Sequence, residues 1–164
     1  MGLLLSAQLL SALFLLALSS SSKETPEERF DKFKLQHTYN QPGEFDCTEF
    51  MDNFLKVLKL RDCKRCNSVI MGNKFTRPAN IRDVRNVCRE EGMHKEDNLY
   101  WSKKQFYVNR CIWTQNSVYP NCEYRSVTLH RHIILGCVGG FPVHFNGTDR
   151  YGSGGPTVQS VISN

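Results

Sequence analysis

The residues most suited to chemistry in this chain of 164 residues are two histidines and a lysine in three separate segments. His37 ends the segment FDKFKLQH, Lys64 lies in DCKRCNSVI, and His144 lies in FPVHF. Histidine can act as a general acid or a general base because its ordinary pKa, about 6.5, lies near neutral pH. Lysine supplies a fixed cation that stabilises negative charge as it develops. Together the three residues could support acid–base catalysis at a centre that becomes more negative.

Each of these residues has an ordinary structural interpretation when it is considered alone. A histidine at the end of a helix is usually a surface or capping residue, so His37 by itself is a weak indication of catalysis. Lys64 could be a solvated charge, and His144 an exposed strand residue. We interpret the remaining histidines as surface or structural residues: His94, His130 and His132.

Seven cysteines follow residue 22, and they predict a disulfide framework with one thiol left over. Their spacing alone leaves the pairing open, and any of them could be the unpaired one. The segment CKRC at Cys63 to Cys66 could instead indicate a metal or redox site. The chain has no second C-x-x-C motif, so we favour structural disulfides and expect neither a metal nor a cofactor.

The first 22 residues contain no charged side chain, and their apolar run is followed by small residues. This pattern predicts a signal peptide over 1–22 and a secreted, extracellular protein. The alternative is a membrane anchor, for which the apolar run is short. We expect one domain over 23–147, a flexible Gly- and Ser-rich tail over 148–164, and a monomer. The net charge of +5 lies outside the uncharged leader and suits an acidic partner such as RNA, a heparin-like glycan or an anionic cell surface.

The elements that must position the candidate residues are short helices followed by strands. Helical spacing of apolar residues predicts helices over 27–36, 46–58 and 80–88. Runs rich in β-branched and aromatic residues predict strands over 106–113, 124–129, 132–137 and 143–145. Helices early and strands late in the chain indicate the α+β class.

Four segments in order resemble signature segments of the pancreatic ribonuclease (ribonuclease A) superfamily. They are FDKFKLQH, DCKRCNSVI, YPNCEYRSV and RHIILGCVGGFPVHF. The resemblance covers about residues 27–147 and implies a ribonuclease A-like fold, with three short helices packed on a curved antiparallel sheet. The sequence is most similar to the angiogenin-like branch, whose members have three disulfides. This resemblance implies that Cys66 is a free thiol and that the other six cysteines pair as Cys47–Cys111, Cys63–Cys122 and Cys88–Cys137.

The resemblance also implies an endoribonuclease that cleaves single-stranded RNA without a metal. RNA carries a 2′-hydroxyl beside each phosphate, and this group attacks the phosphorus to give a 2′,3′-cyclic phosphate. His37 would be the general base, His144 the general acid, and Lys64 the cation for the developing charge. Gln36 and the backbone N–H of Phe145 would bind the phosphate.

Base selection is expected from Asn67 and Ser68, with Phe145 beside the base. The family has Asn-Thr here, and Ser68 keeps the N–H and the hydroxyl of the threonine. The resemblance therefore implies cleavage after pyrimidines. Cys66 and Val69 replace the usual apolar and phenylalanine residues, and Asn146 and Val138 stand in place of an aspartate and a glutamate of the family. Together these four departures predict a working but slower enzyme.

Asn146 stands where the family usually has an aspartate that orients the catalytic acid. It also begins the sequon Asn146-Gly147-Thr148, a possible glycosylation site. Two interpretations follow: a glycan at the rim of the site, or an unmodified amide that bonds to His144. We favour the unmodified amide.

Two other functions fit the same sequence. The first is a cationic secreted effector, angiogenin-like or antimicrobial, with weak ribonuclease activity and a basic face for a cell surface. The second is a catalytically silent carrier, against which the intact set of His37, Lys64 and His144 argues. A ribonuclease inhibitor is a further candidate partner.

Overall fold

The structure is a computed structural model that describes residues 23–39, 41, 44–72 and 79–149. The predicted leader over 1–22 lies outside the described residues, as do residues 150–164 of the predicted tail. None of the described helices is long and apolar enough to cross a membrane.

The described part of the chain contains three helices: α2 (Pro26–His37), α3 (Cys47–Val57) and α4 (Ile81–Asn86). Helix α2 begins with a capping box in which Thr25 and Glu28 bond to each other's backbone N–H, so its start is well defined. Asp46 and Asn80 accept backbone N–H groups at the starts of α3 and α4. The predicted helices are therefore confirmed, although α4 is shorter than the range 80–88.

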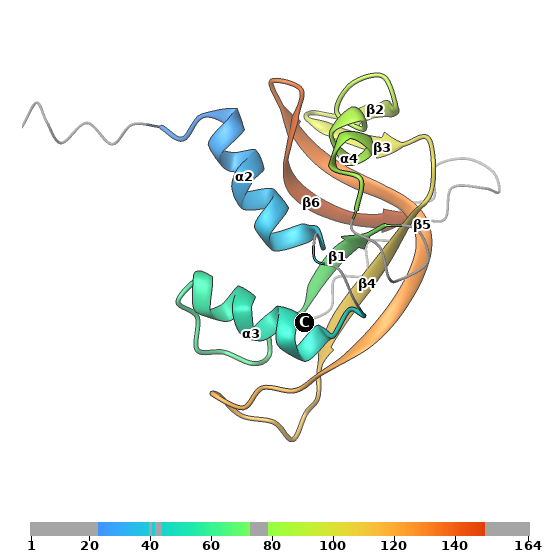
Figure 1. Cartoon of the computed structure of the whole chain (residues 1–164). Coiled ribbons are helices and arrows are strands. Elements are labelled where there is room, and N and C mark those ends of the chain that lie inside the picture. Colours follow the sequence, from blue (N-terminus) through green and yellow to red (C-terminus); the bar gives the residue numbers. More distant parts are fainter. Residues whose placement is uncertain (1–22, 40, 42–43, 73–78, 150–164) are drawn as a thin grey trace, which may run out of the picture.

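Six strands of the described residues form a bent antiparallel sheet in the order β1-β4-β5-β3-β2, with β6 also paired to β5. The strands are β1 (Asn67–Met71), β2 (Gly92–Glu96), β3 (Leu99–Ser102), β4 (Phe106–Trp113), β5 (Tyr124–Val138) and β6 (Phe141–Asp149). Figure 1 shows β5 as the long curved strand that runs the length of the molecule, with α2 and α3 on one side.

Strand β5 corrects the prediction of two strands over 124–129 and 132–137. Its first half, through Arg131, pairs with β4, and its second half, from His132, pairs with β6. Residues 130 and 131 look like a polar break in the sequence, but both pair with β4. One strand therefore connects the two halves of the sheet.

Strand β6 is longer than the predicted range 143–145. Its last residues, Thr148 and Asp149, pair with Ile133 and His132 of β5. The ordered strand thus extends two residues into the predicted tail. The backbone hydrogen bonds of β5 hold this polar segment although its side chains offer little apolar surface to bury.

Two hydrophobic clusters stabilise the two halves. The first joins α2 and α4 to the sheet through residues such as Phe33, Val84 and Leu135. The second packs Met51 and Leu55 of α3 against β4 and β5.

The predicted pairing of the cysteines is confirmed, because disulfides join Cys47–Cys111, Cys63–Cys122 and Cys88–Cys137.

Candidate active site

His37 is the best-positioned of the candidate catalytic side chains. It is the last residue of α2, and its Nδ1 atom lies 3.0 Å from the backbone oxygen of Ser68 in β1. A carbonyl oxygen can only accept, so this bond requires the proton on Nδ1 and leaves Nε2 with its lone pair. The ring is also stacked on Phe145, with centroids 5.4 Å apart, and contacts Phe33 at 5.3 Å. A histidine held in this tautomer can accept a proton at Nε2.

The surroundings of His37 favour its neutral form. Burial is the largest effect and lowers the pKa of His37 below its ordinary value of 6.5. The hydrogen bonds to the Ser68 carbonyl and to the Asn67 side chain raise the pKa of His37. The charge of His144 lowers this pKa further. The net lowering keeps His37 unprotonated at neutral pH, as a general base requires.

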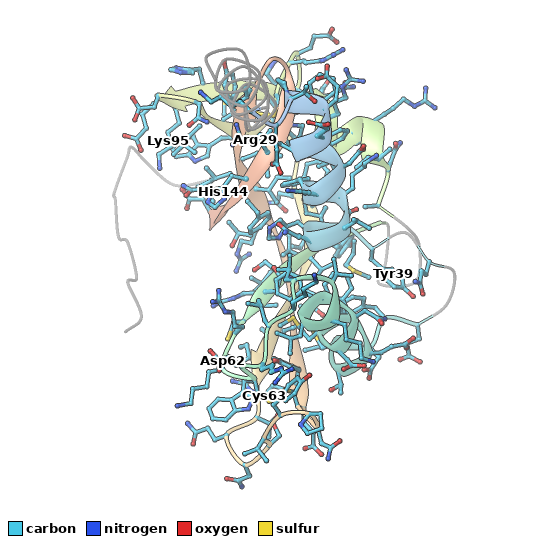
Figure 2. All side chains as sticks on the ribbon, turned by 90° about the vertical axis from the view of Figure 1, so that its left-hand side faces the viewer. Arg29, Tyr39, Asp62, Cys63, Lys95 and His144 are labelled. Atoms are coloured by element: carbon cyan, nitrogen blue, oxygen red, sulfur yellow. A yellow bond between two sulfur atoms is a disulfide. The ribbon has the colours of Figure 1, made fainter. Side chains whose placement is uncertain are left out.

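His144 lies on β6 directly opposite Gly136 of β5, and its side chain is exposed. A Cβ atom at position 136 would come within 3.1 Å of the His144 Cβ, so a glycine keeps this strand pair close. The next residue of β6, Phe145, stacks on the His37 ring, so the two histidines lie on elements that contact each other. Figure 2 shows His144 in the half of the molecule that carries Arg29 and Lys95, whereas Asp62 and Cys63 lie in the other half.

Asn67 fixes the end of α2 against β1. Its side-chain N–H donates to the Gln36 carbonyl at 2.7 Å, and its side-chain oxygen accepts the Ser68 N–H at 2.8 Å. The residue is buried, so these bonds are shielded from water. Asn67 therefore has a clear positioning role, and the predicted pair Asn67 and Ser68 lies directly beside His37.

An open pocket forms around this arrangement. It is lined by His37, Cys66, Asn67, Ser68, Arg110 and Phe145. Four predicted binding or catalytic residues and the predicted free thiol thus meet in one place. Arg110 was missed by the sequence analysis, because its place next to Ser68 follows from the register of β1 and β4. The alternation of β4 could have indicated that Arg110 points out of the core, although not toward which site.

Lys64 and Gln36 do not line this pocket. The Lys64 side chain is exposed, and its backbone N–H donates to Asp62 at 3.0 Å. Gln36 is half-buried, and it lines a separate groove between α2 and α3. The structure thus gathers His37, Asn67, Ser68 and Phe145 in one pocket, whereas Lys64, Gln36 and His144 do not line it.

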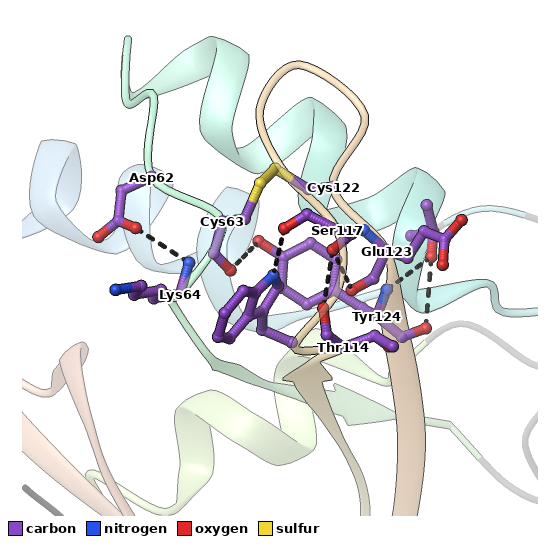
Figure 3. Close-up of a disulfide and its surroundings, with 10 residues drawn as sticks. Asp62, Cys63, Lys64, Thr114, Ser117, Cys122, Glu123 and Tyr124 are labelled. Carbon is purple, nitrogen blue, oxygen red and sulfur yellow. Dashed lines mark hydrogen bonds between the residues drawn. A yellow bond between two sulfur atoms is a disulfide. The ribbon is translucent and has the colours of Figure 1, made fainter.

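The backbone that carries Lys64 is held from the other side by Tyr124. The Tyr124 hydroxyl donates to the Cys63 carbonyl at 2.8 Å, and Cys63 is bonded to Cys122 (Figure 3). Burial is the main reason that the pKa of Tyr124 is raised to about 12, so this hydroxyl remains a donor. These constraints fix the residue immediately before Lys64.

Two further predicted features lie at the rim. Cys66 is a free, exposed cysteine, as predicted. Asn146 is exposed at a bulge of β6, where the register with β5 shifts between Phe145 and Gly147. Among the described residues, no hydrogen bond joins the Asn146 amide to His144.

The described residues contain no group of three or more His, Cys, Asp or Glu side chains that could hold a metal ion.

His132, interpreted from sequence as surface or structural, is buried, and its Nδ1 lies 2.8 Å from the Ser102 carbonyl. Its contacts are those of a structural residue.

A family profile and individual proteins both match this chain. The profile described as "Pancreatic ribonuclease" matches residues 28–146. Ribonuclease-like 3 of Danio rerio is 34% identical over 140 residues, covering 81% of this chain and 89% of that protein. Angiogenin of Mus musculus is 32% identical over 121 residues, covering 73% and 78% respectively.

Solved structures agree with the sequence comparison. The structure titled RNASE ZF-3E superposes with a TM-score of 0.62 at 29% identity, covering 76% of this chain and 98% of that one. Green turtle egg white ribonuclease superposes with a TM-score of 0.59 at 26% identity, covering 77% of this chain and all (100%) of that one.

Proposed function

The chain belongs to the pancreatic ribonuclease family, and on that premise we propose that it is a secreted endoribonuclease that cleaves single-stranded RNA after pyrimidines. One observation carries the proposal: His37 is held with Nε2 free, in a pocket that also contains Ser68 and Phe145. The proposed leader would deliver the protein to an oxidising compartment, which suits its three disulfides.

In the first step, Nε2 of His37 takes the proton of the RNA 2′-hydroxyl. The 2′-oxygen attacks the adjacent phosphorus, and His144 gives a proton to the departing 5′-oxygen. The products are a 2′,3′-cyclic phosphate and a free 5′-hydroxyl. Lys64 stabilises the negative charge that grows on the phosphate oxygens. Gln36 and the Phe145 N–H are the further proposed phosphate contacts.

In the second step the histidines exchange roles. His144 takes a proton from water, the water oxygen attacks the phosphorus of the cyclic phosphate, and His37 returns its proton to the 2′-oxygen. The product is a 3′-phosphate, and both histidines regain their starting protonation states. Every proton is carried by a side chain of this protein, so we propose that the reaction proceeds without a metal.

Ser68 is the proposed reader of the pyrimidine. Its hydroxyl makes no hydrogen bond within the described part of the chain, so it is available to a base. Its N–H is already bonded to Asn67 and must be shared when a base binds. A hydroxyl can both donate and accept, which accommodates either cytosine or uracil.

The test is cleavage of poly(C), poly(U) and tRNA by the purified protein with and without EDTA. We expect equal rates with and without the chelator, and a 2′,3′-cyclic phosphate visible by ³¹P NMR before the 3′-phosphate accumulates. Loss of activity in EDTA, or an active His37→Ala/His144→Ala double variant, would refute the proposal.

The similarity to angiogenins favours a second candidate, a secreted cationic effector that acts at a cell surface. A protein with His144→Ala separates the two functions. Biological activity that survives this substitution supports the effector, whereas activity lost together with RNA cleavage supports the enzyme.

A further inference from the structure

Arg110 is a cation in the wall of the proposed base pocket. In the antiparallel pair of β1 and β4 it lies directly opposite Ser68, and both residues line the pocket. Side chains directly opposite each other across such a pair have Cβ atoms about 4.5–5.5 Å apart. The Arg110 side chain therefore starts beside the Ser68 hydroxyl and is long enough to extend past it.

The Arg110 guanidinium is uncommitted. The side chain is exposed, and within the residues that the structure describes it has no hydrogen bond, ion pair or ring contact. Five N–H donors next to the pocket are thus available to a bound molecule.

Cytosine and uracil differ in hydrogen-bond polarity at two neighbouring positions, N3, which donates in uracil and accepts in cytosine, and the group at position 4. At position 4, uracil presents a carbonyl oxygen, which accepts, whereas cytosine presents an amino group, which donates. A side chain distinguishes the two bases at this position only if it can donate but not accept a hydrogen bond, or accept but not donate one. The Ser68 hydroxyl can rotate to donate or accept, so it binds both bases.

Two other polar side chains of the pocket already make hydrogen bonds. Asn67 bonds to Gln36 and to Ser68 through its amide nitrogen and oxygen. His37 bonds to Ser68 through Nδ1, and its Nε2 is needed for the proton transfer. Arg110 is therefore a pocket side chain that can only donate and that has no hydrogen-bond partner among the described residues.

We propose that Arg110 is a specificity-determining residue that makes this enzyme prefer uracil over cytosine on the 5′ side of the cleaved bond. This inference rests on the proposed function and deepens it. The guanidinium donates to O4 of uracil. With cytosine, the guanidinium N–H groups would face the N–H groups of the 4-amino group. Two donors cannot bond to each other, so cytosine would have no hydrogen bond to Arg110 through this group.

The experiment measures kcat/KM for UpA and CpA with three proteins: wild type, Arg110→Gln and Arg110→Glu. Glutamine can donate and accept, whereas glutamate only accepts. We expect the ratio for UpA over CpA to fall in the order Arg, Gln, Glu, by about tenfold across the series, since one good contact to a base edge discriminates by about that factor. The ratio removes any uniform effect of charge on RNA binding.

Arg125→Gln is the matched control. Arg125 lies on the neighbouring strand β5, is exposed and does not line the pocket. Its substitution removes the same charge from the same sheet, so its ratio should equal that of the wild type. An unchanged ratio in the Arg110 variants, a shift toward uracil, or an equal shift in Arg125→Gln would each overturn the proposal.

Binding of uridine 3′-phosphate and cytidine 3′-phosphate, measured by calorimetry, separates this inference from the proposed function. If wild type cleaves neither dinucleotide, the proposed function is wrong, and the ratio of the two dissociation constants still tests Arg110. If cleavage is normal and both ratios are independent of residue 110, only the inference is wrong.

Discussion

The imidazole of His37, at the end of α2, donates through Nδ1 to the backbone oxygen of Ser68 in β1 over 3.0 Å. Ser68 thus orients His37, the proposed general base, through its backbone carbonyl. Its hydroxyl is the proposed contact to the pyrimidine. A shift of β1 would therefore disturb proton transfer and base binding together. The relationship predicts how this site responds to pH, substitution and labelling.

The first prediction concerns the pH profile. Because burial lowers the pKa of His37, the acidic limb of kcat/KM should have its midpoint below pH 6.5, the ordinary value for histidine. Initial rates on UpA between pH 4 and 9, at about constant ionic strength, measure this limb. An acidic midpoint above pH 6.5 would contradict the neutral His37 described here.

The second prediction concerns stability. A histidine whose pKa is lower in the folded state than in the unfolded state binds more protons when unfolded, so stability increases with pH. His37 should therefore cost no stability well above pH 6.5, and destabilise the fold as the pH falls below that value. In urea titrations at about pH 5 and pH 8, the His37→Gln variant should lose less stability on acidification than the wild type. His94→Gln is the control, since His94 is exposed.

The third prediction concerns Tyr124. Replacing it with phenylalanine leaves the buried Cys63 carbonyl without its donor, which should cost about 1–2 kcal/mol of unfolding free energy. Because Cys63 precedes Lys64, kcat should fall more than the affinity for uridine 3′-phosphate. Tyr39→Phe is the control, as its hydroxyl makes only an exposed contact of 3.4 Å. Equal stability and activity in both variants would show that Tyr124 does not position Lys64.

The fourth prediction concerns Cys66. Iodoacetamide without a reductant should label Cys66 alone among the cysteines, and uridine 3′-phosphate should slow the labelling because Cys66 lines the pocket. Labelled protein should bind the nucleotide more weakly, while Cys66→Ser should resist both effects. Label found on Cys63 or Cys122 would contradict the pairing of the CKRC segment.

The fifth prediction concerns Asn146. Its exposure and the lack of a described bond to His144 favour an accessible sequon over the orienting amide. Protein secreted from eukaryotic cells should lose mass on enzymatic deglycosylation, and cleavage of long RNA should then rise while cleavage of UpA stays constant. If no sugar is found, the orienting amide becomes testable, because Asn146→Asp should then speed cleavage.

The sequence predicted those parts of the fold that have local signals. Helices α2 and α3 have caps and apolar spacing within their own segments, and strand β4 alternates clearly. Strands β2 and β3 were missed because their segment, GMHKEDNLYWS, is largely polar; the two strands pair with each other, and β3 pairs with β5. That His37, Ser68 and Phe145 belong to one site came only from the family resemblance, and their mutual contacts came only from the structure, since three distant segments must meet.

Arg110 shows most clearly where the sequence stops being informative. Nothing near it in the chain marks it as a pocket residue, and only the pairing of β1 with β4 places it beside Ser68. Local periodicity gives the face of a strand, but a neighbour across the sheet depends on tertiary register.

The continuous strand β5 makes the two parts of the proposed site one covalent unit. One half of β5 pairs with β4, which carries Arg110 and pairs in turn with β1 and Ser68, while the other half pairs with β6, which carries His144 and Phe145. Helix α2 contacts both β1 and β6, and its last residue, His37, contacts one residue of each strand, Ser68 and Phe145. A change in the curvature of β5 would therefore be felt at His37, where the two parts of the site meet.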